Sequence, residues 1–136
     1  MLRAVAIAVV VAACARTPLA ATQSVALGQS FALKVGQSVV LAGEGLELAF
    51  ESVVSDSRCP RGVQCIRAGD ATIRLAAEKA PNARAPIQLG TTASTADATY
   101  GQYSIRLLSL NPYPDASRRT QPDEYEATLI VTRLQP

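Results

Sequence analysis

The stretch EYEATLIVT, residues 124–132, alternates apolar and polar side chains except at Ile130. In an extended chain such alternation places the apolar residues on one face, as in a strand that covers a core. The apolar set here is Tyr125, Ala127, Leu129 and Val131. We therefore expect a strand that closes the fold, with its apolar side facing inward.

The same period of two recurs in six shorter stretches upstream: 31–35, 39–41, 46–51, 71–77, 87–89 and 103–107. Turn-forming residues separate them, and no amphipathic helix interrupts the series. The stretch 91–98 fits either a loop or a weak edge strand. About seven short strands of this kind predict an all-β fold, an antiparallel β-sandwich of the immunoglobulin-like type, with a small β-barrel as the alternative.

The alternation loses phase at Ser52, Val53 and Val54. A strand that keeps its direction but changes phase usually contains a β-bulge or a bend. We expect one there, where the strand enters the segment that carries two cysteines.

The chain of 136 residues has room for one domain of ordinary size. A domain of this length buries enough surface to fold without a metal or many disulfides. We expect a signal peptide over 1–13, a flexible tether over 14–29 and the β-sandwich domain over 30–136.

The N-terminus has the pattern of an export signal. Arg3 is followed by ten uncharged, mostly apolar residues, 4–13, which are too few to span a bilayer. Val11-Ala12-Ala13-Cys14 resembles a bacterial lipobox, and this resemblance implies a lipid on Cys14 that anchors the protein to a membrane. Ordinary cleavage after Ala15 is the alternative. Either route exports the domain to the cell envelope, which in a Gram-negative cell means the outer membrane or the periplasm.

Three cysteines are present, and lipidation uses Cys14. Cys59 and Cys65 remain, with five residues between them that include a proline and a glycine. In an oxidising compartment we expect this pair to form a disulfide. A redox or metal site is the weaker alternative, because a reactive dithiol usually has two intervening residues and a zinc site needs about four ligands.

Charge and composition disfavour several classes of function. Lys plus Arg number 13 against 11 Asp plus Glu, so we expect no nucleic acid partner. Histidine is absent, which removes the usual general base and most zinc sites, and we expect no enzyme activity, no metal and no cofactor. A hydrolase that uses loop carboxylates is an alternative, with the candidates Asp56, Asp70, Asp115 and Asp123.

Two blocks carry a resemblance to known sequences. The first is Asp56-Ser57-Arg58-Cys59-Pro60 with Cys65 and Ala68-Gly69, and the second is Asn111-Pro112-Tyr113-Pro114 with Asp123-Glu124-Tyr125. Together they resemble a family of small exported bacterial proteins to which no activity is attached. The resemblance implies an envelope location and a β domain. Arg67 stands where that pattern often has an aromatic residue.

The first block suggests a recognition loop. Arg58, Arg61 and Arg67 flank the covalently fixed turn, and Tyr113 is held between two prolines. The alternative is that the arginines pair with Asp56 and Asp70 and close the loop onto the sheet. We expect a non-catalytic envelope lipoprotein module that binds a protein or polymer partner through these loops, with a protease inhibitor as the second hypothesis.

Overall fold

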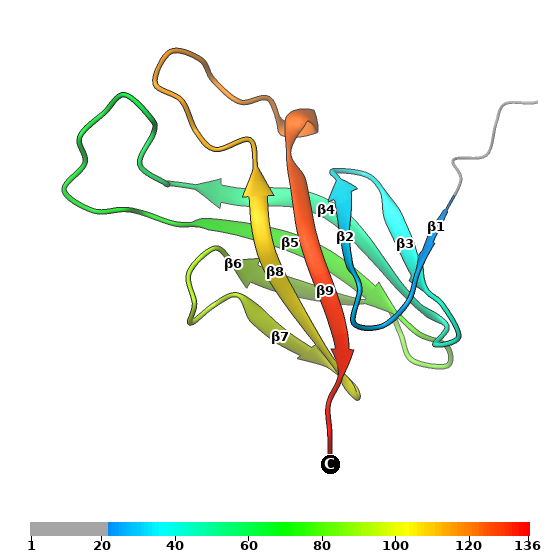
Figure 1. Ribbon diagram of the computed structural model, residues 1–136. Coiled ribbons are helices and arrows are strands. Elements are labelled where there is room, and N and C mark those ends of the chain that lie inside the picture. The colour runs from blue at the N-terminus through cyan, green and yellow to red at the C-terminus, as the bar shows by residue number, and fades with distance from the viewer. Residues whose placement is uncertain (1–21) are drawn as a thin grey trace, which may run out of the picture.

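A computed structural model describes residues 22–136, which form two packed β-sheets (Figure 1). The described residues contain nine strands and one short 3-10 helix, η1 (Pro122–Glu124). The strands are β1 (Gln23–Val25), β2 (Ser30–Lys34), β3 (Ser38–Leu41), β4 (Leu46–Asp56), β5 (Ala71–Glu78), β6 (Ala85–Gly90), β7 (Asp97–Tyr100), β8 (Tyr103–Asn111) and β9 (Glu126–Arg133).

One sheet has the order β1-β3-β4-β5-β6 and the other the order β2-β9-β8-β7. Every neighbouring pair is antiparallel except β1 and β3, which run parallel. The two sheets do not close into a barrel. The predicted antiparallel sandwich is confirmed, and the barrel alternative is wrong.

The core lies between the two sheets and follows the alternation of the sequence. In β9 the side chains of Ala127, Leu129 and Val131 are fully buried, as the period of two predicts. They face a second set from the other sheet that is equally buried: Leu46, Leu48, Phe50, Ala71, Ile73 and Leu75. Burial of the leucine, isoleucine, valine and phenylalanine side chains among them contributes about 1.5–3 kcal/mol each and is the main term that stabilises the fold.

Two strands exceed the expected seven. β7 begins at the end of the stretch 91–98, which fitted either a loop or an edge strand, and continues to Tyr100. β1 lies inside residues 14–29, where we expected a flexible tether. That expectation is wrong for the last part of the range, because Val25 is 9% exposed and packs in the core. One apolar residue after two exposed polar ones gives no alternation, so the sequence did not signal β1. The expected signal peptide and Cys14 lie outside the described residues.

The expected irregularity in β4 is confirmed. Its register against β5 shifts between Phe50 and Ser52 and again between Val53 and Ser55. On the other side of β4, the pairing with β3 ends at Ala49, opposite Ser38. The second half of β4 therefore pairs with β5 alone. Within residues 22–136, no helix is long and apolar enough to cross a membrane.

Candidate functional site

Two loops lie side by side at one end of the sandwich (Figure 1). The first, residues 57–70, connects β4 to β5 and is called here the disulfide loop. The second, residues 112–121, follows β8 and is called the proline loop. The Arg61 N–H donates to the carbonyl of Pro114 at 2.9 Å, and the Ala116 N–H donates to the carbonyl of Arg61 at 3.1 Å. The two loops are therefore joined through their backbones.

The disulfide between Cys59 and Cys65 is present, with 5.9 Å between the two Cα atoms. The base of the loop is closed by backbone bonds from Ser57 N–H to the Asp70 carbonyl, 2.7 Å, and from Cys59 N–H to the Ala68 carbonyl, 2.8 Å. A closed loop this short contributes about 2 kcal/mol through chain entropy. The disulfide thus fixes the tip of the loop, and the ladder formed by the two backbone hydrogen bonds fixes its base.

Arg58 does not point to solvent. It is 8% exposed, and its Nη2 lies 2.7 Å from Oδ2 of Asp56, whose side chain is 9% exposed. Its Nη1 donates to the carbonyl of Leu110 at 2.7 Å, and Nη2 also donates to the carbonyl of Pro112 at 3.1 Å. The prediction that Arg58 contacts a partner is wrong, because these three groups surround its guanidinium and the side chain is buried. The alternative, in which an arginine pairs with Asp56 and closes the loop onto the sheet, is confirmed for this residue.

Asp70, the second expected acidic partner, forms no ion pair with an arginine within residues 22–136. Instead the Ser57 hydroxyl donates to the backbone carbonyl of Asp70 at 3.0 Å. The role of Asp70 is therefore to close the base of the disulfide loop.

The Tyr125 hydroxyl donates to Oδ2 of Asp56 at 3.0 Å and ties the start of β9 to the same carboxylate. Burial acts to raise the pKa of Asp56, but the hydrogen bonds and the charge of Arg58 outweigh it and lower that pKa below 3.8, its ordinary value. Burial and the bond to Asp56 raise the pKa of the Tyr125 phenol. The carboxylate of Asp56 is therefore held in its charged form as the centre of this network.

This network makes the free energy of unfolding depend on pH in the acid range. Because the folded-state pKa of Asp56 is depressed, its contribution is complete above the unfolded pKa and is lost as pH falls below about 4. We expect the difference in unfolding free energy between wild type and Asp56→Asn to shrink between pH 6 and about pH 3. Urea titrations at several pH values measure it. A difference that stays constant with pH would contradict the assignment.

Tyr113 and Arg61 are brought together, whereas Arg67 is separate. The Tyr113 ring is 40% exposed, with Cζ of Arg58 at 5.1 Å and Cζ of Arg61 at 5.5 Å from its centroid. These distances are in the range of cation–π contacts. Arg67 is exposed, and its side chain has no ion pair or hydrogen bond to any of residues 22–136.

The tip of the disulfide loop exposes two apolar side chains that the sequence reasoning missed. Val63 is 50% exposed and Ile66 is 104% exposed. Both lie in or next to a turn of five residues closed by a disulfide. Such a turn is too short to fold its side chains back onto the core, and this is the signal that was available in the sequence.

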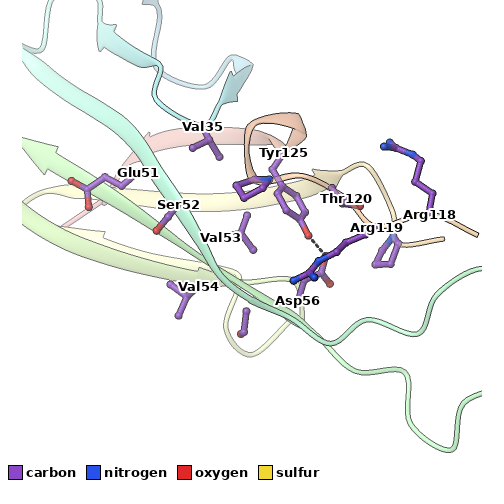
Figure 2. A pocket seen from close by; sticks show the side chains of 13 residues that line it. Val35, Glu51, Ser52, Val53, Val54, Asp56, Arg118, Arg119, Thr120 and Tyr125 are labelled. Atoms are coloured by element: carbon purple, nitrogen blue, oxygen red, sulfur yellow. Dashed lines mark hydrogen bonds between the residues drawn. The ribbon is translucent and has the colours of Figure 1, made fainter. Parts of the chain in front are cut away.

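A groove of about 530 Å³ lies between the second half of β4 and the proline loop (Figure 2). Its walls include Val35 just after β2, six consecutive residues of β4, the proline loop, the first residue of η1 and Tyr125 just before β9. The lining residues are Val35, Glu51, Ser52, Val53, Val54, Ser55, Asp56, Pro114, Arg118, Arg119, Thr120, Pro122 and Tyr125.

The hydrolase alternative needs two carboxylates that face one cleft. Of the four candidate aspartates, Asp56 lines the groove and is paired with Arg58, while Asp70, Asp115 and Asp123 are not among the lining residues. Glu51, the other acid of the groove, is paired with Arg84 at 3.1 Å. No group of three or more histidine, cysteine, aspartate or glutamate residues that could hold a metal ion occurs in the described part of the chain.

Neither the protein-family models, nor the curated proteins, nor the solved structures compared with this chain match it. The resemblance of the two sequence blocks to small exported proteins therefore stays a prediction.

Proposed function

We propose that this protein is a non-catalytic module of the cell envelope that binds a protein partner through the loops at the disulfide end of the sandwich. The envelope location rests on the pattern of residues 1–14. The binding surface rests on the geometry of the disulfide loop and the proline loop.

The observation that carries the proposal is the full exposure of Ile66 at the tip of a rigid loop. Single exposed apolar residues are common on protein surfaces. Here, however, a disulfide, a backbone ladder and the buried Arg58 all hold the loop that displays it. A loop that is ordered before its partner arrives has a smaller entropic cost of binding. Ile66 and Val63 thus have the setting of a binding anchor.

The surroundings of the tip add a charge pattern. Arg61 and Arg67 flank the two apolar side chains, and both arginines are exposed. Arginine next to an apolar anchor is a common composition for the centre of a protein interface. We therefore place the contact surface on Val63, Ile66, Arg61, Arg67 and Tyr113.

Crosslinking in intact cells of the source organism tests this proposal. The full chain is expressed with a C-terminal tag as wild type, as the double variant Val63→Ser/Ile66→Ser, and as Leu134→Ser. Leu134 is a matched control because it is 43% exposed and lies beyond β9, at the other end of the sandwich (Figure 1).

We expect the double variant to lose partner adducts by at least about tenfold, the effect of removing an interface anchor, and the control to keep them. The replaced side chains are exposed, so all three proteins should unfold at similar temperatures. Identical adduct profiles for the double variant and wild type would remove the loop tip as the binding surface.

A further inference from the structure

The outer edge of β4 is open alongside the groove. β3 covers this edge up to Ala49, and backbone bonds with Gln37 and Gly36 continue the cover to Phe50. Beyond that point, residues 51–56 have backbone hydrogen bonds to β5 only, within the part of the chain that the structure describes. Their outward N–H and C=O groups form a template for one more strand.

The groove follows this edge and does not lie on one face of the sheet. Side chains of a strand alternate between the two faces, so a cavity over one face is lined by every second residue. This groove is lined by Glu51, Ser52, Val53, Val54, Ser55 and Asp56 in unbroken succession. Two register shifts interrupt the alternation in this stretch, so its side chains reach both faces, and the groove runs beside the part of β4 whose outer backbone groups have no partner strand within residues 22–136 (Figure 2).

The opposite wall of the groove carries unbalanced positive charge. Both acids of the groove are neutralised, Asp56 by Arg58 and Glu51 by Arg84. Arg118 is paired with Glu124 at 2.8 Å. Arg119 lines the groove, is exposed, and has no ion pair with any of residues 22–136.

From these observations we propose that an extended, acidic segment of the protein partner adds to β4 as a further strand along residues 51–56, with a carboxylate facing Arg119. This inference rests on the proposed function and names the chemistry of the partner. Six residues of strand span about 20 Å, enough for backbone bonds along a segment of four to six residues.

In this mode the backbone bonds supply much of the affinity, and the side chains supply specificity. Val54, which is 50% exposed in the groove, offers an apolar contact, and Arg119 selects an acidic neighbour. The disulfide loop then contributes its apolar tip to a more distant part of the same partner.

Photo-crosslinking of the full chain in cells tests the inference. The photoreactive residue p-benzoylphenylalanine is placed at Val54 in the groove, at Ile66 on the loop tip, or at Leu108. Leu108 lies on β8, outside the groove, and is 50% exposed like Val54. We expect the same partner at Val54 and Ile66 and none at Leu108, and we expect mass spectrometry to map the Val54 adduct to an acidic segment.

The charge of Arg119 provides a second readout. Arg119→Glu is expected to lower the adduct yield at Val54 by about tenfold, because it opposes an acidic segment with a like charge. Arg106→Glu is the matched control, since Arg106 is also exposed and lies on β8, outside both the groove and the two loops. Equal effects of the two replacements would overturn the role of Arg119.

A synthetic peptide with the mapped sequence tests the backbone bonds. Methylation of its alternate amide nitrogens should weaken binding to the full chain by at least tenfold, because it removes the donors that face β4. Unchanged affinity would overturn strand addition.

The outcomes separate the two proposals. A partner adduct at Ile66 with none at Val54, an adduct at Val54 that maps to a basic or helical segment, or an adduct with lipid alone would overturn the strand inference. The first two of these results leave the proposed function standing. The absence of a protein adduct at both positions would overturn both proposals.

Discussion

Replacing Arg58 by methionine is expected to lower the free energy of unfolding by about 3–5 kcal/mol, although the residue belongs to a loop. The change leaves the carboxylate of Asp56 at 9% exposure without its counter-charge. It also removes the donors that satisfy the carbonyls of Leu110 and Pro112. A buried charge that loses its partner costs far more than an exposed ion pair contributes.

Urea denaturation at neutral pH measures this effect, with Arg67→Met as the control. Arg67 belongs to the same loop but is exposed, so its replacement should change stability by less than about 0.5 kcal/mol. The combination of Arg58→Met with Asp56→Asn should cost less than the sum of the two single changes, since it removes both charges of the pair. Equal stability of the two methionine variants would contradict the network described here.

Gly69→Ala is expected to destabilise the domain by more than about 3 kcal/mol. Gly69 has a φ of +67°, a region that costs a residue with a Cβ about 1–2 kcal/mol. A Cβ at this position would also lie 1.8 Å from the carbonyl oxygen of Ser57. The two sides of the loop base would have to separate, which breaks backbone bonds worth about 0.5–1.5 kcal/mol each.

The variant Gly62→Ala separates the cost of the positive φ from the cost of the close contact with Ser57. Gly62 lies in the same loop with a φ of +85°, but a Cβ there meets no atom closer than 4.0 Å. It should show the backbone penalty alone, about 1–2 kcal/mol. Chemical denaturation of both variants gives the comparison. If Gly69→Ala were no worse than Gly62→Ala, the close approach to Ser57 would not be a constraint on the loop.

The strands were predictable because alternation is a local property of the chain. Leu48 and Phe50, or Leu129 and Val131, reveal their inward face without reference to any other strand. The burial of Arg58 was not predictable in this way. Besides Asp56, its acceptors are the carbonyls of Leu110 and Pro112, which are 52 and 54 residues away in sequence, and no local period connects them to Arg58.

The candidate site could be predicted only in part, because some of its features are local in the sequence and others depend on distant segments. The disulfide followed from the cysteine count and the expectation of export, and the flanking arginines marked the loop. Which arginine turns inward depends on the position of the proline loop relative to the disulfide loop. The open edge of β4 depends on the point at which β3 stops, and a sequence that alternates through residues 46–51 does not reveal how many neighbours a strand has.

The network around Asp56 has a further consequence, for the way the native protein opens. Apart from the local pair between Arg58 and Asp56, its bonds join segments separated by 52 to 69 residues, so they form only when β4, β8 and β9 already lie in register. Because these contacts and the backbone bonds of Arg61 hold the two loops to each other, we expect the disulfide loop and the proline loop to open together while the ladders of the core remain intact. The two loops are therefore a single unit of sub-global unfolding, and their amide protons should exchange with solvent as one group, ahead of those of the strands.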